Sequence, residues 1–301
     1  MKNNKIIVKI SEGLGNQLFM YANAYSLAQK YNLNLFIDSK SGFYKKSLYP
    51  YMLHNFSITP NYAEEKEIFN THLKNFKKKI LIYSVFLKKD KRFIYESKNK
   101  KKITSFAPIK INENVSSIYI DGNFECEKYF IDYKDQILNQ FKIVNSEKFN
   151  NDYLKLIRNN NVIAISVRQN RYSERINNYK SSIAINKSID FVKDTVKYIY
   201  NAIDYISLKI ENPIFLIWSN DFKNLEKYFP KNKFIFVKND TDKYLTDFYL
   251  LTQCKYHIVG PSTFSWWGAW LSNFNSKICI RPSKINPSNN LDFWPESWIS
   301  I

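Results

Sequence analysis

Hydrophobic positions recur along the chain at two different spacings, which predict strands and helices in alternation. Residues 5–10 are rich in β-branched side chains, which predicts a strand. Apolar residues then recur at helical spacing over 18–28, and a second strand is predicted at 33–38. This order of strand, helix and strand is typical of an α/β domain.

The rest of the chain, from about residue 117, continues the same alternation. The predicted strands are 117–121, 162–167, 214–218, 234–237, 257–259 and 277–280. The predicted helices are 127–140, 189–205, a helix near 225, 245–254 and a helix from 264. Such alternation favours parallel sheets with helices on both faces, whose ligands bind at the carboxyl ends of the strands. We therefore expect the turns after Val167, Trp218 and Val259 to gather at one edge.

Residues 39–115 sustain neither spacing and form an insertion-like, basic region. Within them, 74–102 carries twelve Lys or Arg against Asp90 and Glu96. The apolar run ILIYSVFL between lysines could rest on an anionic membrane surface, and it equally fits a solvated helix with one apolar face packed.

Composition and charge narrow the class of protein. The 301 residues are 45% hydrophobic and 24% charged, as in globular proteins. The 45 basic and 27 acidic residues give a net charge of +18, which attracts anions, but no nucleic-acid reader motif organises it. Three scattered cysteines fit neither a zinc site nor a disulfide framework. We expect a cytoplasmic protein, at most peripheral to the inner membrane, because neither a signal peptide nor a membrane span is evident.

The turn EGLGNQ at 12–17 lies between the first predicted strand and helix. Glycines let the backbone approach a ligand, and amides at a helix start bind anions, so Gly13, Gly15 and Asn16 are candidate donor-binding residues. They equally fit a tight turn capped by Asn16, because the third glycine of the dinucleotide-binding motif is missing.

The segment GPSTFSWWG at 260–268 follows one predicted strand and starts a helix. Its hydroxyl residues Ser262, Thr263 and Ser265 would converge on the positive end of the helix dipole, where a diphosphate is held well. The alternative is an N-cap followed by aromatic core packing, which explains the tryptophan pair but not three hydroxyls in one turn.

Arg168 directly follows the predicted strand at 162–167. A guanidinium group binds phosphate through two parallel hydrogen bonds, so this position suits a pyrophosphate leaving group. The nearby Arg171 and Arg175 also fit a solvated basic loop.

Together these passages resemble the bacterial α-1,2-fucosyltransferase family, whose members are inverting enzymes that use GDP-fucose. The resemblance covers most of the chain outside about 39–115. It is carried by GLGNQLFMYANAYSLA (13–28), DGNFECEKYF (121–130), IWSNDF (217–222) and DFYLLTQCKYHIVGPSTFSWWGAWLS (247–272).

The resemblance implies an α/β fold of the GT-B type, with two Rossmann-like domains whose parallel sheets face an interdomain cleft. Residues 1–155 would form the acceptor-side domain and 156–301 the domain that binds the GDP-sugar. The implied reaction moves L-fucose from GDP-fucose to the 2-hydroxyl of a terminal β-galactoside, without metal or other cofactor, in O-antigen or other glycan synthesis.

One motif departs from the family. Where the family reads His-x-Arg-Arg-Gly-Asp-Tyr, residues 166–172 read SVRQNRY, which keeps the first arginine and the tyrosine. The resemblance therefore gives Arg168 the phosphate role and leaves the acid without a counterpart in register. It also makes Asp221, with Ser219 in the same motif, a candidate for recognising guanine or ribose, while 261–263 (PST) keeps two of the family's hydroxyls.

Inverting transfer builds positive charge on the sugar and negative charge on the departing diphosphate, so we expect catalysis from Arg168 and the Ser262 turn. Glu12 is the first candidate for the base, with Glu125 and Glu174 open, although Glu12 also fits an exposed turn residue.

Two alternatives remain. The acidic pair in DTD at 240–242 mimics a manganese site of a metal-dependent glycosyltransferase with another donor, although a loop and N-cap explain it better. The altered motif at 166–172 would also suit a catalytically silent GDP-sugar or glycan-binding protein.

Overall fold

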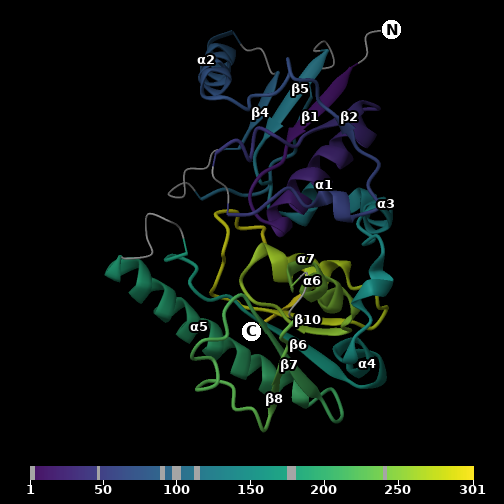
Figure 1. Cartoon of the computed structure of the whole chain (residues 1–301), viewed down its shortest axis with the longest axis vertical. Coiled ribbons are helices and arrows are strands. Elements are labelled where there is room, and N and C mark those ends of the chain that lie inside the picture. The colour runs from purple at the N-terminus through teal and green to yellow at the C-terminus, as the bar shows by residue number, and fades with distance from the viewer. Residues whose placement is uncertain are drawn as a thin grey trace. The chain divides into compact units, whose positions relative to one another are not determined.

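The computed structural model describes residues 4–45, 48–88, 92–96, 103–111, 116–174, 181–239 and 243–301 (Figure 1). The chain forms two compact units, one of Met1–Val144 with Ser288–Pro295 and the other of Asn145–Pro287 with Glu296–Ile301. The boundary predicted at 155/156 instead falls inside helix α4 (Asp152–Asn159). Because Leu154 and Ile157 of that helix pack in the core of the second unit, the whole helix belongs there.

The first unit is built on a five-stranded sheet in which every pair of neighbours is parallel. Its order is β3-β2-β1-β5-β4, from β1 (Lys5–Lys9), β2 (Asn34–Asp38), β3 (Asn61–Tyr62), β4 (Phe93–Tyr95) and β5 (Ser117–Asp121). Helix α1 (Leu14–Lys30) packs against β1 and β2 through fully buried residues that include Leu18 and Ala22. Helices α2 (His72–Lys88) and α3 (Lys134–Gln140) complete this unit's α-helices in the described residues.

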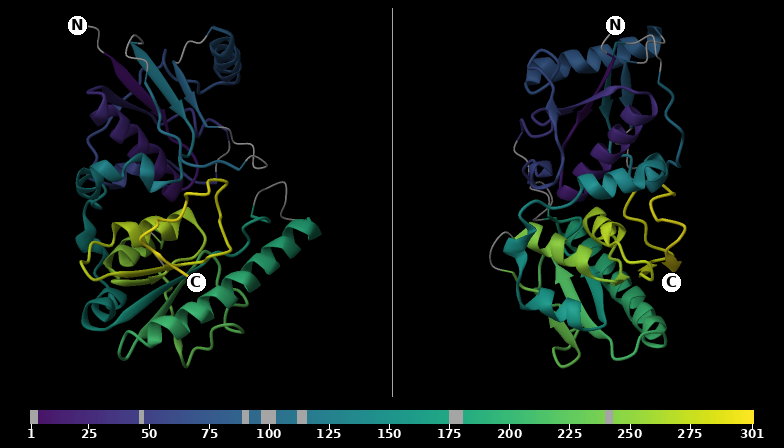
Figure 2. Two further views of the ribbon diagram at one scale, coloured as in Figure 1. Left: turned by 180° about the vertical axis from the view of Figure 1, so that it is seen from behind. Right: turned by 90° about the vertical axis from the view of Figure 1, so that its right-hand side faces the viewer.

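The second unit holds a six-stranded parallel sheet of order β11-β10-β9-β6-β7-β8. The strands are β6 (Val162–Val167), β7 (Ile214–Ser219), β8 (Phe234–Phe236), β9 (Tyr256–Ile258), β10 (Ile278–Arg281) and β11 (Ile299–Ser300). Odd-numbered residues of β6 pack against α5 (Ser182–Ser207), and Val162 and Ala164 pack with residues of α4 and α6 (Lys243–Gln253) on the other face. Figure 2 shows these helices around the sheet. The predicted α/β fold with parallel sheets is confirmed.

Three predicted elements differ from the structure. The helix expected near 225 is a series of turns, because Asn224 adopts a left-handed backbone (φ 62°). The helix expected at 127–140 is split into two 3-10 turns, Glu127–Tyr129 and Ile131–Tyr133, followed by α3, with the extended φ of Phe130 between them. Helix α5 begins earlier than expected because the Ser181 side chain caps it, accepting from the Ala184 amide.

In its described residues, the predicted insertion at 39–115 contributes two edge strands, a 3-10 helix (Leu53–Asn55) and helix α2. Strands β3 and β4 have two and three residues, too few for an alternating pattern to be visible in the sequence. In the part of the chain that the structure describes, no helix is long and apolar enough to cross a membrane.

Candidate active site

Arg168 follows the central strand of the second sheet. On one side of β6, Val167 pairs with Ser219 of β7, and on the other side Ile165 pairs with Ile258 of β9. The loops after these three strands therefore leave the same edge of the sheet, as predicted.

Gly260 brings the loop after β9 against the end of β6. A Cβ built on Gly260 would lie 2.1 Å from the backbone oxygen of Ser166, so no larger residue fits without moving the backbone. Ser262 follows Gly260 by two residues, as Arg168 follows Ser166. This close approach brings the loop that begins with Arg168 and the turn that holds Ser262 out side by side at one edge of the sheet.

Helix α7 (Thr263–Leu271) starts at this turn, and Ser262 is its N-cap. The Ser262 Oγ accepts a hydrogen bond of 3.2 Å from the Ser265 amide. Thr263 opens the helix and is half-buried. Ser265 differs from its predicted role, because its buried hydroxyl donates to the Gly260 carbonyl at 2.6 Å and so holds the turn. The tryptophans of this helix supply core packing, as Trp266 and Trp267 are fully buried.

Two arginines organise the loop after β6. Arg168 forms an ion pair with Glu174, and both side chains are about one quarter exposed, at 23% and 27%. Arg171, predicted to fit a solvated loop, instead donates to the carbonyls of Pro261 (3.3 Å) and Pro287 (2.5 Å). It thereby ties this loop to the turn before α7. Arg175 lies outside the described residues.

The loops after β6 and β7 hold each other. The Gln169 amide donates to the Asn220 Oδ1 at 2.8 Å, and the Asn170 side chain donates to the Asp221 carboxylate at 2.9 Å. The Ser219 hydroxyl donates to the Asp221 carbonyl at 2.6 Å. Asn170 has a left-handed backbone (φ 56°), a conformation that glycine adopts readily, and the family that the sequence resembles has glycine at this position. Ser219 and Asp221 therefore lie beside the Arg168 loop, with Ser219 bonded within its own turn.

In the first unit, three carboxylates follow the carboxyl ends of neighbouring parallel strands. Glu12 follows β1, Glu96 follows β4 and Glu125 lies four residues after β5, and these three strands are neighbours in the sheet. The Asn123 Nδ2 lies 3.4 Å from an oxygen of Glu12 and 3.4 Å from one of Glu125. Glu96 accepts from the backbone amides of Asn123 and Phe124 at 2.7 and 2.8 Å.

Backbone strain accompanies this carboxylate cluster (Glu12, Glu96 and Glu125). Glu12 and Phe124 both adopt left-handed conformations, with φ of 68° and 51°. Such a conformation costs a non-glycine residue about 1–3 kcal/mol and is often found at functional sites. Gly122 is also required here, because a Cβ on it would lie 2.4 Å from the Cβ of Glu96.

The surroundings of Glu125 change its acidity. Burial raises its pKa to about 7, and the charges of Glu12 and Glu96 add to the rise, while hydrogen bonds from Ser288 and Asn123 oppose it. A carboxylate with such a pKa is a stronger base than an exposed one. Glu125 was one of the open candidates for the base, whereas Glu96 and Asn123 were not predicted as site residues. All three follow the end of a predicted or observed strand.

The predicted glycine turn belongs to this first unit. Gly13 is the N-cap of α1 and offers no side chain to the first helical amides, and Gly15 lies in the first turn of the helix. Asn16 does not cap α1, because its side chain donates to the Glu12 carboxylate instead. The turn therefore orients Glu12.

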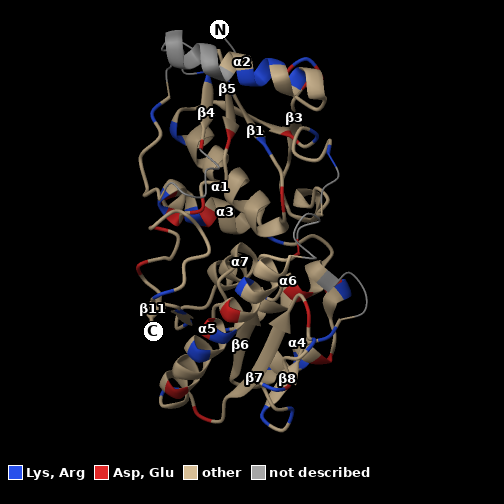
Figure 3. Ribbon diagram, turned by 90° about the vertical axis from the view of Figure 1, so that its left-hand side faces the viewer, with Lys and Arg blue, Asp and Glu red and all other residues tan. Residues whose placement is uncertain are grey.

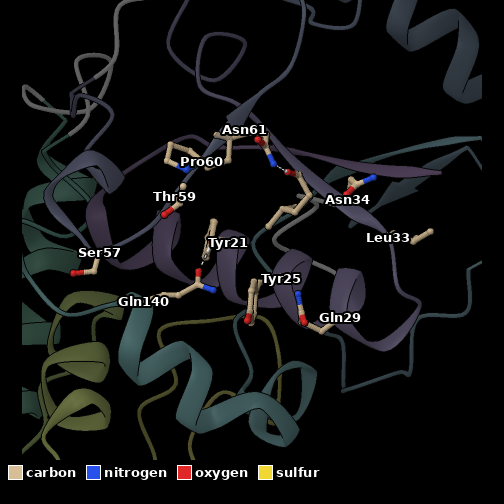
Figure 4. Close-up of a pocket in the computed structure, with 12 residues that line it drawn as sticks. Tyr21, Tyr25, Gln29, Leu33, Asn34, Ser57, Thr59, Pro60, Asn61 and Gln140 are labelled. Atoms are coloured by element: carbon tan, nitrogen blue, oxygen red, sulfur yellow. Dashed lines mark hydrogen bonds between the residues drawn. The ribbon is translucent and has the colours of Figure 1, made fainter. Parts of the chain in front are cut away.

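A pocket of about 290 Å³ lies further along α1, between that helix, β2 and the segment at 57–61 (Figure 4). Tyr21 and Tyr25 stack there, with ring centroids 6.1 Å apart and planes 15° from parallel. All of its lining residues are uncharged, and side-chain amides from Gln29, Asn61 and Gln140 are among them. Such a mixture of aromatic faces and amides suits a neutral, hydroxyl-rich ligand.

The described residues contain no group of three or more His, Cys, Asp or Glu placed to hold a metal ion. The acidic pair of 240–242 lies outside the described residues. His257 lies in β9, where its ring donates to the Cys254 carbonyl at 2.9 Å. Burial lowers the pKa of His257 to about 3, so the ring is neutral and structural.

Comparison with known proteins gives a family and several relatives. The profile of glycosyl transferase family 11 matches residues 2–299. An Escherichia coli alpha-1,2-colitosyltransferase is 28% identical over an alignment of 318 positions, which covers 98% of this chain and 98% of that protein. The Escherichia coli O-antigen biosynthesis glycosyltransferase WbnK is also 28% identical, over 97% of this chain and 99% of its own.

Solved structures share the fold at low sequence identity. The fucosyltransferase NodZ from Bradyrhizobium has a TM-score of 0.51 at 14% identity, covering 89% of this chain and 93% of that one. NodZ alpha-1,6-fucosyltransferase soaked with GDP-fucose has a TM-score of 0.50, also at 14% identity, covering 89% and 92% of the two chains. The chain thus has the α/β fold of GT-B fucosyltransferases.

Proposed function

The chain belongs to glycosyl transferase family 11, and we propose that it transfers L-fucose from GDP-fucose to the 2-hydroxyl of a terminal β-galactoside, with inversion and without metal. The product would be part of an O-antigen or related glycan, as the names of the relatives suggest. The name of the colitosyltransferase supports GDP-colitose as the competing donor. Colitose is fucose without the 3-hydroxyl, so the residues that bind GDP-fucose can also bind GDP-colitose.

The observation that carries this proposal is the adjacency of Arg168 and the start of α7 in the second unit. Arg168 supplies a permanent cation, and the helix supplies amides and the positive end of its dipole. Both stabilise the charge that develops on a diphosphate leaving group. Glu174 pairs with the guanidinium of Arg168 until the donor binds. It also gives Arg168 a carboxylate partner, which the motif at 166–172 lacks at the position of the family's acid.

In the proposed reaction, the acceptor oxygen forms a bond to carbon 1 of the sugar from the face opposite GDP. The bond from carbon 1 to the β-phosphate oxygen breaks, and its electron pair leaves on GDP. The proton of the acceptor hydroxyl passes to a carboxylate of the first unit. We assign this base to Glu125 in its ionised form, with Glu12, the earlier candidate, as the neighbouring charge that raises the pKa of Glu125.

The pocket beside α1 is proposed to hold neighbouring sugar residues of the acceptor chain. Tyr25 is half-buried and stacked on the buried Tyr21, so its ring is a fixed surface for a pyranose. Replacing Tyr25 by Ala should raise KM for an extended acceptor about tenfold, with little change for a disaccharide. Equal changes for both acceptors would contradict an extended site.

The test of the function is a donor and acceptor screen. We expect GDP release from GDP-fucose in the presence of lactose or a β-galactoside, and an α-1,2 linkage in the product. The reaction should proceed fully in EDTA. Preference for GDP-colitose would change the donor but keep the mechanism, whereas activity restored only by Mn²⁺ would favour a metal-dependent enzyme. GDP-sugar binding without turnover would indicate a silent binding protein.

A further inference from the structure

Helix α2 has its polar and apolar sides reversed relative to an ordinary surface helix. Leu73, Phe76 and Ile80 are 65%, 61% and 53% exposed. Their spacing of three and four residues puts them on one side of the helix. An ordinary surface helix turns such a stripe toward the core.

The opposite side of α2 attaches to the first sheet through polar groups. Lys78 is 5% exposed, and its Nζ lies 2.6 Å from a carboxylate oxygen of Asp121, at the end of β5. The other oxygen of Asp121 accepts from Lys9 at 2.6 Å. The side chain of Asn75 donates to the Tyr44 hydroxyl at 2.8 Å.

This attachment fixes the apolar stripe on the outer side. If the helix rolled to bury Leu73, Phe76 and Ile80, it would withdraw Lys78 from Asp121. Asp121 would then face Lys9 alone, and the lysine would lose its buried partner.

Lysines border the exposed stripe. Lys77 and Lys79 are exposed on the same turns, and no acidic residue occurs in the helix sequence HLKNFKKKILIYSVFLK. Figure 3 shows basic positions recurring along α2. We propose that this face of α2, formed by Leu73, Phe76, Lys77, Lys79 and Ile80, docks the protein onto an anionic lipid surface.

The lysines beside the stripe favour an anionic lipid surface over a second copy of the chain as the partner of this face. A twofold contact through the stripe would gather the lysines of both copies with no acidic side chain of α2 to pair with them, which is repulsive. An anionic bilayer accepts apolar side chains below its headgroups and attracts the bordering lysines. The proposal stands independently of the donor and acceptor assigned above.

Sedimentation with vesicles of phosphatidylcholine, with and without phosphatidylglycerol, tests this surface on the full chain. We expect binding only to the anionic vesicles, lost as added NaCl shortens the Debye length from about 10 Å to about 3 Å. The double variant Phe76→Glu, Ile80→Glu should bind at least about tenfold more weakly. Leu208→Glu, which places the same acid on a side chain 88% exposed in the second unit, is the matched control and should bind as the parent does.

A second variant keeps the test decisive if the first one folds poorly. Lys77→Ala with Lys79→Ala changes only exposed residues and should weaken binding to anionic vesicles about fivefold per lysine. The proposal is overturned if the parent protein binds neither vesicle, or if Leu208→Glu weakens binding as much as the α2 variants. It is also overturned if Phe76→Glu, Ile80→Glu abolishes self-association of a protein that never binds vesicles.

Discussion

The two units carry sheets of the same parallel kind but opposite chemistry at their strand ends. In the first unit the loops after β1, β4 and β5 present Glu12, Glu96 and Glu125. In the second unit the loop after β6 presents Arg168, and the loop after β9 leads to the positive end of α7. The difference teaches that the same kind of parallel sheet can present carboxylates or cationic groups at its strand ends, because the loops carry these groups.

The units also differ in how their strand-end loops are held. The second unit ties its loops together through side chains, such as Arg171 on the Pro261 carbonyl. The first unit holds its carboxylates through the Asn123 side chain and the backbone amides of Asn123 and Phe124. Left-handed backbone occurs in both units, at Glu12 and Phe124 in the first and at Asn170 in the second. The carboxylates of the first unit thus lie beside like charges, whereas both described arginines of the loop after β6 have an acceptor, Glu174 for Arg168 and the Pro261 carbonyl for Arg171.

The largest effect is expected from removing the cation of the second unit. Arg168→Ala should lower kcat about 10²–10³-fold, because Arg171, the other arginine of this loop among the described residues, is held by the carbonyls of Pro261 and Pro287. Arg168→Lys should recover little, since the paired hydrogen bonds are lost. Arg158→Ala, at an exposed position on α4, is the control and should be neutral. Near-normal turnover by a folded Arg168→Ala enzyme would end the proposed donor site.

Removing the proposed base of the first unit should have the next largest effect. Glu125→Gln should lower kcat about 10²-fold at neutral pH, because the amide accepts no proton. Steady-state kinetics with saturating donor measure this, with the exposed Glu64→Gln as the control. If Glu12→Gln abolished turnover and Glu125→Gln did not, the base would be Glu12 and the assignment would be reversed.

Stability offers a third comparison, within the first unit. Asp121→Asn should lower the free energy of unfolding by about 3–5 kcal/mol, because Lys9 and Lys78 lose their shared buried partner. Burial alone would raise the pKa of Asp121, but the two ammonium groups outweigh it and lower this pKa below its ordinary 3.8. The contribution is thus complete above the ordinary pKa and is lost as the pH falls below it. Denaturant unfolding of both proteins across acidic pH tests this, and equal stabilities at neutral pH would contradict it.

The smallest effect is a shift of a pH profile. Turnover should rise as Glu125 ionises, with a midpoint near its pKa of about 7. Glu12→Gln removes a negative charge that raises this pKa, so the midpoint should move to lower pH while the plateau stays within a few fold. A midpoint that does not move would show that the charge of Glu12 does not act on the group that titrates. A midpoint that persists in residual activity of Glu125→Gln would assign it to another group.

Local signals in the sequence were sufficient for most strands of the second unit, although not for the turns near 225. The spacing of apolar residues predicted β6, β7 and β9, and their parallel pairing confirms that the loops after them leave one edge of the sheet. Arg168 and Ser262 each lie within three or four positions of a predicted strand. The prediction for Ser265 differed because its hydroxyl is taken by the Gly260 carbonyl, a contact that spacing does not reveal.

Long-range contacts determined the rest. Glu12, Glu96 and Glu125 are far apart in the chain, and only the pairing of β1, β4 and β5 brings them to one edge. The sequence of α2 shows an apolar run among lysines, but it does not say which side is covered. Asp121 decides that, 43 positions away, by holding Lys78. The sequence thus determined most of the longer strands and helices and the loops of the cationic edge, because those signals are local. The tertiary structure decided the carboxylate cluster and the exposed face of α2, because both depend on charges that only folding brings together.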